Sequence, residues 1–255
     1  MPNPRWTYDR QIARNLLGVV GVDEAGRGCL AGPVVSGCVI LPAVFFTDAK
    51  NRKWVENIND SKKFTESTRE ELFGRIGKLI ADGRIFGATG SASVAEIEEH
   101  NIVGATCLAM QRAMETASEN SGGLWVPLSR QGRDLFSREM KEESRWAVLV
   151  DGRPMKRLPF KHQGLIKGDC LSLAVAMGSL LAKVTRDRIM HRINEEFPEY
   201  GFSSNKGYGA PVHIQALQTL GATIHHRPRF LRNLSNESAI EEKGSHHKQT
   251  RLSFV

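Results

Sequence analysis

The sequence predicts an α/β domain, in which buried strands alternate with amphipathic helices. Two observations carry this prediction. Short apolar runs rich in β-branched residues recur at 16–22, 33–41 and 146–150, as is typical of strands buried on both faces. Segments between them repeat their apolar residues every three or four positions, which is the helical period. With 255 residues, 40% of them hydrophobic, the chain is long enough for a sizeable core.

The first two strands are expected to form a hairpin. A polar, proline-containing lead covers 1–15, and the apolar run 16–22 then ends in Asp23 and Glu24. A glycine-rich turn separates this run from the next one, 33–41.

A helix is expected from Thr65, which acts as its N-cap, to about Ala81. Leu72 and Ile76 lie four residues apart on one face, as does Ile80 after them, which predicts an apolar stripe. The glycine at position 83 is expected to end this helix.

The middle of the chain continues the alternation. Residues 85–89 form the next expected strand, and a capping box of Ser93 and Glu96 begins a short helix. A second helix is expected over 103–117. Residues 119–142 are polar and irregular, which is typical of a loop insertion.

In the second half, the strand 146–150 ends in Asp151. A short strand is expected at 164–166, and a long helical pattern runs from about 171 to 196. Past Arg232 the chain turns polar, which predicts a flexible tail.

The charge balance fits a partner with phosphate groups, the alternative being charge that only keeps the protein soluble. The formal net charge is +7, and an excess of lysine and arginine is expected in proteins that meet nucleic acid. No segment has the length of apolar residues that a membrane span needs, and the first 20 residues do not have the pattern of a signal peptide. The four cysteines form no CxxC pair, so we expect free thiols in the cytoplasm; they are Cys29, Cys38, Cys107 and Cys170.

Acidic residues stand at the ends of predicted elements. Asp23 and Glu24 follow the first strand, Asp151 ends the strand 146–150, and Asp169 precedes the long helix. Each has an ordinary alternative, since Asp151 could form a turn and Asp169 could cap the helix. In α/β sheets, however, ligands bind beyond the carboxyl ends of strands. Together the acids therefore indicate one functional site.

Carboxylates gathered at one sheet edge repel one another unless cations neutralise them. Oxygen ligands without histidine or cysteine favour Mg²⁺ or Mn²⁺. In a basic protein this points to phosphodiester chemistry, in which two metal ions about 4 Å apart activate a water and stabilise the leaving oxygen. The turn from Gly26 to Gly28 is not a phosphate-binding Walker loop, because the GKS/T ending is missing. Its glycines would instead let nucleic acid approach the backbone.

The segment GVDEAGRGCLAGPVV, which starts at Gly21, resembles the signature of ribonuclease HII, the type 2 ribonuclease H. Seven further segments resemble that family in the family's order. They are NDSKK (59–63), HNIVGATCLAMQRA (100–113), VLVDG (148–152), IKGD (166–169), SLLAKVTRDR (179–188), NKGYG (205–209) and GATIHHR (221–227). The resemblance implies an N-terminal extension over 1–16, a catalytic domain over 17–231 and a tail over 232–255.

The resemblance implies an RNase H-like fold with a central mixed β-sheet, flanking helices and a helical C-terminal part. It implies metal-dependent cleavage of RNA in RNA–DNA hybrids and 5′ of a ribonucleotide embedded in duplex DNA. Products would carry 3′-hydroxyl and 5′-phosphate ends, and the cell would use the activity in ribonucleotide excision repair and DNA replication. The family's catalytic and metal-binding acids fall on Asp23, Glu24, Asp151 and Asp169, with two Mn²⁺ or Mg²⁺ ions; Asp23 and Asp151 would contact both.

The resemblance also assigns substrate contacts. The ribonucleotide-sensing turn falls on Gly26, Arg27 and Gly28, whose main chain would read the 2′-hydroxyl. Tyr208 would stack under the sugar or base, the alternative being a half-buried core tyrosine. Further candidates, with solvated or packing side chains as the alternatives, are Lys62 and Lys206 for phosphate contact and Ser179 near the acids.

Three features depart from the family pattern. Cys29 stands where the family usually has proline, and Met177-Gly178 replace two small residues. The segment 130–145 is longer and more charged than expected. Ribonuclease HIII fits less well because it has an extra N-terminal domain and a different glycine motif, and type 1 ribonuclease H lacks the DEAGRG turn.

The end of the chain resembles the short peptides that dock on bacterial sliding clamps. Gln249 would be a polar anchor and Leu252 and Phe254 apolar ones, the alternative being a tail with two chance hydrophobic residues. Two alternatives remain for the whole chain: a catalytically inactive hybrid-binding module, or another RNase H-like nuclease. We expect a monomer with no membrane contact.

Overall fold

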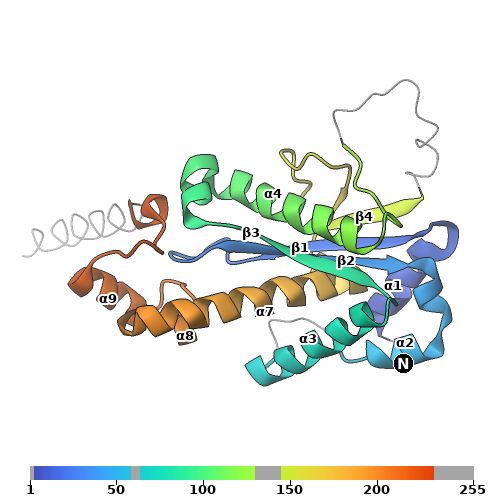
Figure 1. Cartoon of the computed structure of the whole chain (residues 1–255), viewed down its shortest axis with the longest axis horizontal. Helices are drawn as coiled ribbons and strands as arrows, with labels where there is room; N and C mark the ends of the chain where they lie inside the picture. The colour runs from blue at the N-terminus through green and yellow to red at the C-terminus, as the bar shows by residue number, and fades with distance from the viewer. Residues whose placement is uncertain (1–2, 59–63, 130–144, 233–255) are drawn as a thin grey trace, which may run out of the picture.

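The computed structural model describes residues 3–58, 64–129 and 145–232. Its centre is a five-stranded sheet in the order β3-β2-β1-β4-β5. Helices cover both faces of the sheet, and the described chain beyond α7 (Leu173–Glu196) is helical as well (Figure 1). The predicted α/β class is therefore confirmed, with a mixed sheet, flanking helices and a helical C-terminal part.

The strands pair as the hairpin and crossover pattern requires. β1 (Gly18–Ala25) and β2 (Val34–Pro42) form the predicted antiparallel hairpin. β3 (Phe86–Ala92) is antiparallel to β2. On the other side, β4 (Trp146–Asp151) runs parallel to β1, and β5 (Gln163–Leu165) runs parallel to β4.

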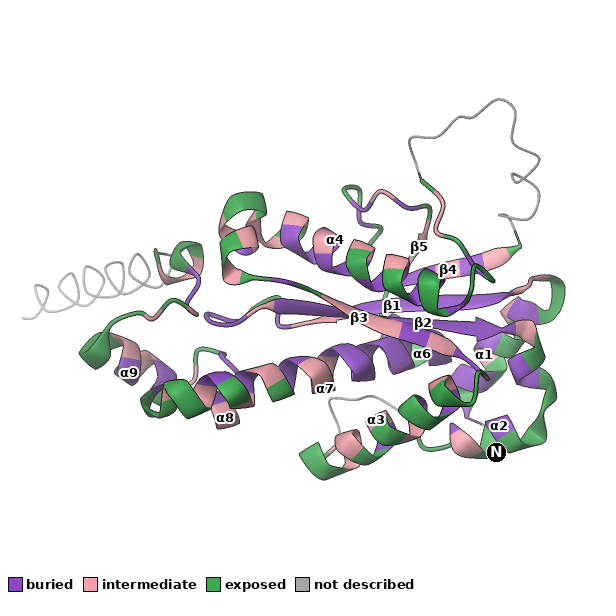
Figure 2. Ribbon diagram, viewed as in Figure 1, coloured by how far each residue is buried: buried purple, intermediate pink, exposed green. Residues whose placement is uncertain are grey.

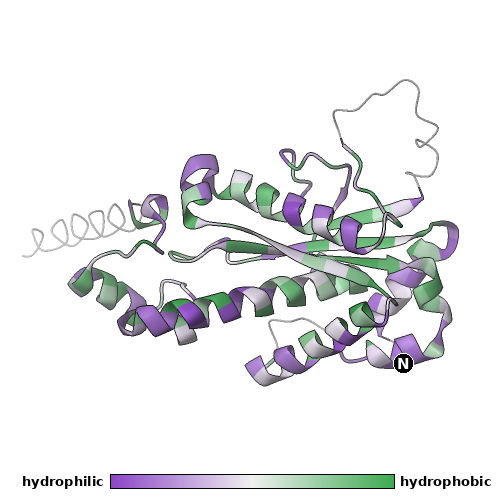
Figure 3. Cartoon of the chain, in the orientation of Figure 1, coloured by the Kyte–Doolittle hydropathy of each residue, from purple (hydrophilic) through white to green (hydrophobic). Residues whose placement is uncertain are grey.

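Both faces of the sheet are buried, which explains why β1 and β2 are nearly continuous apolar runs (Figures 2 and 3). Val19 of β1 packs into the core beneath α7 (Leu173–Glu196). Its neighbour Val20 packs into the opposite core, beneath α4 (Val94–Asn120). Successive residues of β1 thus pack into the cores on opposite faces of the sheet.

Helix α7 lies against the backbone of the hairpin without side chains in between. A Cβ atom on Gly21 of β1 would stand 2.1 Å from the carbonyl carbon of Ala174, and one on Gly37 of β2 would stand 2.2 Å from the oxygen of Gly178. Real Cβ atoms do not approach so closely, so glycine is required at both positions. This contact fixes how near α7 comes to the strands.

The remaining helices are shorter, and one of them was predicted in detail. α3 (Glu66–Ala81) begins at the predicted N-cap Thr65 and buries Leu72 and Ile76. The expected helix from 171 instead begins as the short α6 (Gly168–Leu171), followed by α7. The others are α1 (Pro4–Ile12), α2 (Ala49–Trp54), α8 (Phe202–Asn205), α9 (Pro211–Leu220) and the 3₁₀ turns Ala13–Asn15, Ala43–Thr47 and Pro198–Tyr200.

Helix α4 contains the boundary between the two helices that the sequence predicts. The capping box of Ser93 and Glu96 is present at its start. Asn101 then interrupts the helical backbone with a φ of 56° and a ψ of 171°. Its side-chain oxygen accepts hydrogen bonds from the amides of Val103 and Gly104, so Asn101 caps the longer second part.

The N-terminal residues are part of the main core. The sequence predicts only a polar lead here, but α1 forms, with Asn3 as its N-cap, and Trp6 is buried against Phe45 and Phe46. Asp9 is buried too. Its Oδ2 atom accepts hydrogen bonds from the Ser172 hydroxyl and the Ala174 amide at the start of α7.

The C-terminal part has a small core of its own, in which Tyr200, Phe202 and Met190 are buried. Its last described turn is tied to α4 by exposed ion pairs. Arg229 and Arg232 both reach the Glu98 carboxylate, at 3.3 and 3.1 Å.

The structure also tests two expectations about the cysteines and about membrane-spanning helices. All four cysteines are free thiols, as predicted. Within the described residues, no helix is both long and apolar enough to cross a membrane.

Asp9 generates a prediction about stability. Burial raises the pKa of Asp9 to about 7. The folded chain therefore holds a proton that the unfolded chain has already lost above about pH 4, so this group's contribution to stability falls as the pH rises toward 7. The wild type should lose about 2 kcal/mol of its free energy of unfolding between pH 5 and pH 7 through this group. Asp9→Asn cannot ionise, so it should not show this part of the loss.

Urea unfolding of the wild type and Asp9→Asn at pH 5 and pH 7 measures this difference. The exposed Asp82→Asn serves as the matched control and should keep the wild-type pH dependence. If Asp9→Asn loses as much stability between the two pH values as the wild type, Asp9 does not titrate in this range.

Candidate active site

Two acids meet at the carboxyl ends of neighbouring parallel strands. The last residue pair in the register of β1 and β4 is Val22 with Val150, and the next residues along each strand are Asp23 and Asp151. Parallel strands end at the same edge of a sheet, so the two carboxyl groups lie close together, as the sequence predicts.

The third acid, Glu24, joins this pair. Burial raises the pKa of Asp23 well above its usual value, and the charges of Glu24 and Asp151 raise it further. The Ser179 hydroxyl on α7 hydrogen-bonds to Asp23 and opposes that rise in its pKa. Burial also raises the pKa of Glu24, although Arg27 partly offsets it. The buried Asp23 thus lies beside two further carboxyl groups, which is a cation-attracting arrangement.

Asp169 reaches the same region by its main chain. The Gly168 amide donates a 2.6 Å hydrogen bond to Oδ1 of Asp151, and Asp169 is the next residue. Asp169 is buried, and its carbonyl accepts a 2.8 Å hydrogen bond from Nε of Arg5 on α1. The start of α6 is therefore tied both to β4 and to the N-terminal helix.

The four acids do not form a closed cage. Across residues 3–58, 64–129 and 145–232, no three His, Cys, Asp or Glu side chains are grouped tightly enough to hold a metal ion. Their chemistry nevertheless fits a divalent cation, because Asp23 carries the repulsion of two neighbouring carboxylates.

Two buried arginines hold the turn that follows β1. Arg227 donates to the carbonyl oxygens of Gly26, Arg27 and Gly32, at 2.8 to 3.2 Å. Gly26 has a φ of +88°, and a Cβ atom there would stand 1.8 Å from Nε of Arg186. Burial lowers the pKa of Arg227 to about 10, so this side chain stays charged at neutral pH.

The outer side of the turn is open. Nothing lies within 4 Å of the position that a Gly28 side chain would occupy. The Arg27 side chain is 45% exposed and donates a 3.2 Å hydrogen bond to Oε1 of Glu24. The carbonyls of the turn therefore face the buried arginine, while Gly28 faces outward.

Tyr208 lies beside this turn, 49% exposed. Its hydroxyl contacts the thiol of Cys29, which is fully buried. Burial and this contact both raise the pKa of Tyr208. The ring is thus held at its hydroxyl end, while about half of the side chain is exposed.

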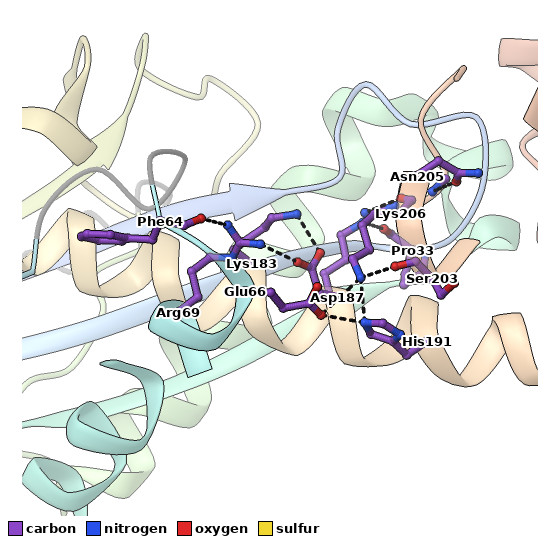
Figure 4. Close-up of polar contacts among 12 residues, drawn as sticks. Pro33, Phe64, Glu66, Arg69, Lys183, Asp187, His191, Ser203, Asn205 and Lys206 are labelled. Carbon is purple, nitrogen blue, oxygen red and sulfur yellow. Dashed lines mark hydrogen bonds and ion pairs between the residues drawn. The ribbon is translucent and has the colours of Figure 1, made fainter. Parts of the chain in front are cut away.

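Two lysines, Lys62 and Lys206, are predicted to contact phosphate, and the structure describes only Lys206. The Lys206 ammonium points inward, 2.7 Å from Nε2 of His191 and 3.4 Å from Glu66, and donates to the Ser203 carbonyl (Figure 4). It therefore links the start of α3 to α7 and α8. Lys62 and the tail residues Gln249, Leu252 and Phe254 lie outside the described residues.

The sequence motifs do not identify three arginines that support the site, Arg5, Arg186 and Arg227. For Arg186 the sequence contains a signal, because the preceding segment 173–182 has no charged residue. The structure buries all of that segment. A charged residue in such a stretch needs buried acceptors. For Arg186 these are the carbonyl oxygens of Ala31, Pro33 and Lys206.

Known proteins share this chain's sequence over most of its length. The family model "Ribonuclease HII" matches residues 20–233. The ribonuclease HII of Fusobacterium nucleatum is 40% identical over 236 residues, covering 92% of this chain and 93% of that protein. The ribonuclease HII of Ehrlichia ruminantium, strain Welgevonden, is 38% identical over 212 residues, covering 83% and 84%.

Solved structures share the fold at low sequence identity. The ribonuclease HII in a complex with PCNA from Archaeoglobus fulgidus has a TM-score of 0.53 at 23% identity, covering 82% of this chain and 93% of that one. Bst-RNase HIII in complex with Mn²⁺ has a TM-score of 0.57 at 15% identity, covering 85% and 68%. The RNase H-like fold is thereby confirmed. With the matches along the sequence, the chain belongs to the ribonuclease HII family, endoribonucleases that hydrolyse RNA in RNA–DNA hybrids.

Proposed function

We propose that this chain also nicks duplex DNA on the 5′ side of a single embedded ribonucleotide, leaving 3′-hydroxyl and 5′-phosphate ends. The adjacency of Asp23 and Asp151 at the ends of β1 and β4 carries the proposal. The turn 26–28 follows β1 directly, so a ribose read there lies near the acids. The catalytic unit spans 17–231, and the reaction serves ribonucleotide excision repair and DNA replication in the cytoplasm.

The catalytic acids are Asp23, Glu24, Asp151 and Asp169, and they bind Mn²⁺ or Mg²⁺. When bound, such ions activate a water and stabilise the leaving oxygen of an in-line displacement. The raised pKa of Asp23 supports this assignment, because a cation relieves the repulsion that causes part of the rise.

The protein's own groups orient these acids. Ser179 fixes Asp23 through its hydroxyl, and the Gly168 amide fixes one oxygen of Asp151. Asp23 also accepts a 2.7 Å hydrogen bond from the Glu24 amide at its Oδ1 atom, so its carboxyl group is oriented from two sides. Positioning of this kind lowers the reorganisation that the reaction requires.

The turn and Tyr208 recognise the ribonucleotide. Gly26, Arg27 and Gly28 present main-chain groups to the 2′-hydroxyl, which is the local difference between RNA and DNA. Arg227 supports this role by holding two of the turn's carbonyls in place. The Tyr208 ring stacks under the sugar or base at the junction. Lys62 contacts phosphate, whereas Lys206 acts indirectly, since its ammonium is already bound inside the protein.

The C-terminal tail docks on a sliding clamp through Gln249, Leu252 and Phe254. The similar fold of a ribonuclease HII solved with PCNA supports a clamp as the partner class. A tail of this length raises the local concentration of the enzyme at replicating DNA. The nuclease itself works as a monomer.

The acids generate the first test. A duplex DNA with one ribonucleotide, incubated with Mn²⁺ or Mg²⁺, should be nicked once, and an all-DNA duplex should stay intact. Asp23→Asn and Asp151→Asn should each reduce the nicking rate by more than about a hundredfold, because each removes a charged metal ligand. Binding to the RNA–DNA hybrid should survive in both.

The exposed Asp82→Asn is the matched control and should nick at the wild-type rate. Full activity in either site variant would refute the assignment of the acids. A wild type that binds hybrids but cleaves nothing would favour the alternative of an inactive binding module.

Tyr208 generates the second test. Tyr208→Ala should lower kcat/KM for the single-ribonucleotide duplex about tenfold, because a stacking ring is lost. Tyr208→Phe keeps the ring and should stay close to the wild type. Steady-state kinetics on the same duplex compares them, and equal values for Ala and wild type would exclude stacking.

The tail generates the third test. Removal of 249–255 should abolish binding to the bacterial sliding clamp and leave the nicking rate unchanged. Surface plasmon resonance on immobilised clamp measures the first and the duplex assay the second. Unchanged clamp affinity after the deletion would end this part of the proposal.

A further inference from the structure

Two histidines are buried between Tyr208 and the segment that holds the turn. His213 is on α9 and is fully buried, and His226 is 2% exposed. Their Nε2 atoms lie 3.0 Å apart. The rings of Tyr200 and Phe202 pack against both, so the pair lies in an aromatic box.

The outer nitrogens of the pair have fixed partners. Nδ1 of His226 lies 2.9 Å from the Thr223 amide, which can only donate, and 3.0 Å from the Thr223 hydroxyl, which can do either. The amide requires an acceptor, so this nitrogen carries no proton. Nδ1 of His213 lies 2.7 Å from the Tyr208 carbonyl, which can only accept, so this nitrogen carries the proton. The two ends of the pair thus determine both tautomers.

The inner contact then follows. A neutral His226 has its proton on Nε2, and a neutral His213 has a free lone pair on Nε2, so the 3.0 Å contact is one complete hydrogen bond. The chain of bonds runs in a single direction: Thr223 amide to His226, His226 to His213, and His213 to the Tyr208 carbonyl.

The two neutral rings carry one proton each, and the hydrogen-bond chain leaves no place for an additional proton on either ring. Protonation of His213 at Nε2 would set two N–H groups against each other, and protonation of His226 at Nδ1 would oppose the Thr223 amide. The neighbouring His225 ring adds no acceptor to the pair, since it packs on Phe197. Burial lowers the pKa of His213, and it lowers that of His226 to about 4, so both are neutral near pH 7.

This pair joins the two parts of the ribonucleotide site. His226 precedes Arg227, whose guanidinium holds the carbonyls of Gly26 and Arg27. His213 holds the carbonyl of Tyr208. The two residues 226–227 therefore connect to the turn on one side and to the tyrosine on the other.

We propose that His213 and His226 are positioning residues that fix Tyr208 relative to the turn 26–28 through this directional hydrogen-bond chain, and so set the selectivity for a ribonucleotide. The inference rests on the proposed function of Tyr208 and the turn. It adds two residues that touch neither substrate nor metal.

Nitrogen NMR tests the hydrogen-bond chain without any catalysis. In the wild type at pH 7, the ¹⁵N shifts should identify His213 as the Nδ1–H tautomer and His226 as the Nε2–H tautomer. The opposite tautomer at either residue, or a charged ring, would overturn the inference.

Kinetics tests the effect on selectivity. His213→Phe keeps a ring of similar shape but breaks both hydrogen bonds. It should reduce the ratio of kcat/KM for the ribonucleotide duplex to that for a continuous RNA–DNA hybrid by about tenfold to a hundredfold. His213→Asn, whose amide can donate where Nδ1–H did, should recover much of the ratio. His225→Phe is the matched control and should match the wild type.

A folded His213→Phe with wild-type selectivity would overturn the inference. If that variant does not fold, the comparison is between His213→Asn and Tyr208→Ala. A selectivity of His213→Asn no higher than that of Tyr208→Ala would then overturn the inference. A wild type that does not nick the ribonucleotide duplex would refute the proposed function. The NMR measurement of the two tautomers tests the hydrogen-bond chain independently of that result.

Discussion

The direct contact of α7 with the backbone of the β1–β2 hairpin controls the geometry of the site. Gly21 and Gly37 on the strands leave no room for a side chain, so the helix axis comes as near to the sheet as backbone atoms allow. Only at this separation can the short hydroxyl of Ser179 reach Asp23. The same helix carries Arg186 to the carbonyls that follow β1. A wider spacing would remove these contacts together.

Buried positive charge shapes the substrate side of the site in an unusual way. Arg186 and Arg227 are each 1% exposed, and the partners that the structure gives their guanidinium groups are main-chain carbonyls. Carbonyl dipoles satisfy the donors but do not cancel the charge. The positive charge therefore remains beside the turn and Tyr208. Under the proposed function, it would attract an approaching phosphate group.

The sequence predicts the parts of this structure that local physics controls. The strand ends that place Asp23 and Asp151, the cap at Thr65 and the box at Ser93 all depend on residues close in the chain. It does not predict α1, because that helix is polar by composition and is held by contacts with residues more than 40 positions away, such as Val55 with Asn3. The inward turn of Lys206 and the pairing of His213 with His226 were missed for the same reason. Such contacts exist only once distant segments meet.

The N-terminal helix changes where the functional unit begins. The match to the ribonuclease HII family model starts at residue 20, yet Arg5 holds the carbonyl of Asp169 and Asp9 holds the start of α7. A protein shortened to residues 20–233 would keep the four acids of the site. It would lose the two hydrogen-bonding side chains of α1, Arg5 and Asp9, that hold the segment around Asp169 and the start of α7. For anyone engineering this enzyme, an affinity tag belongs ahead of an intact first helix, because α1 supports the catalytic unit from outside its proposed bounds.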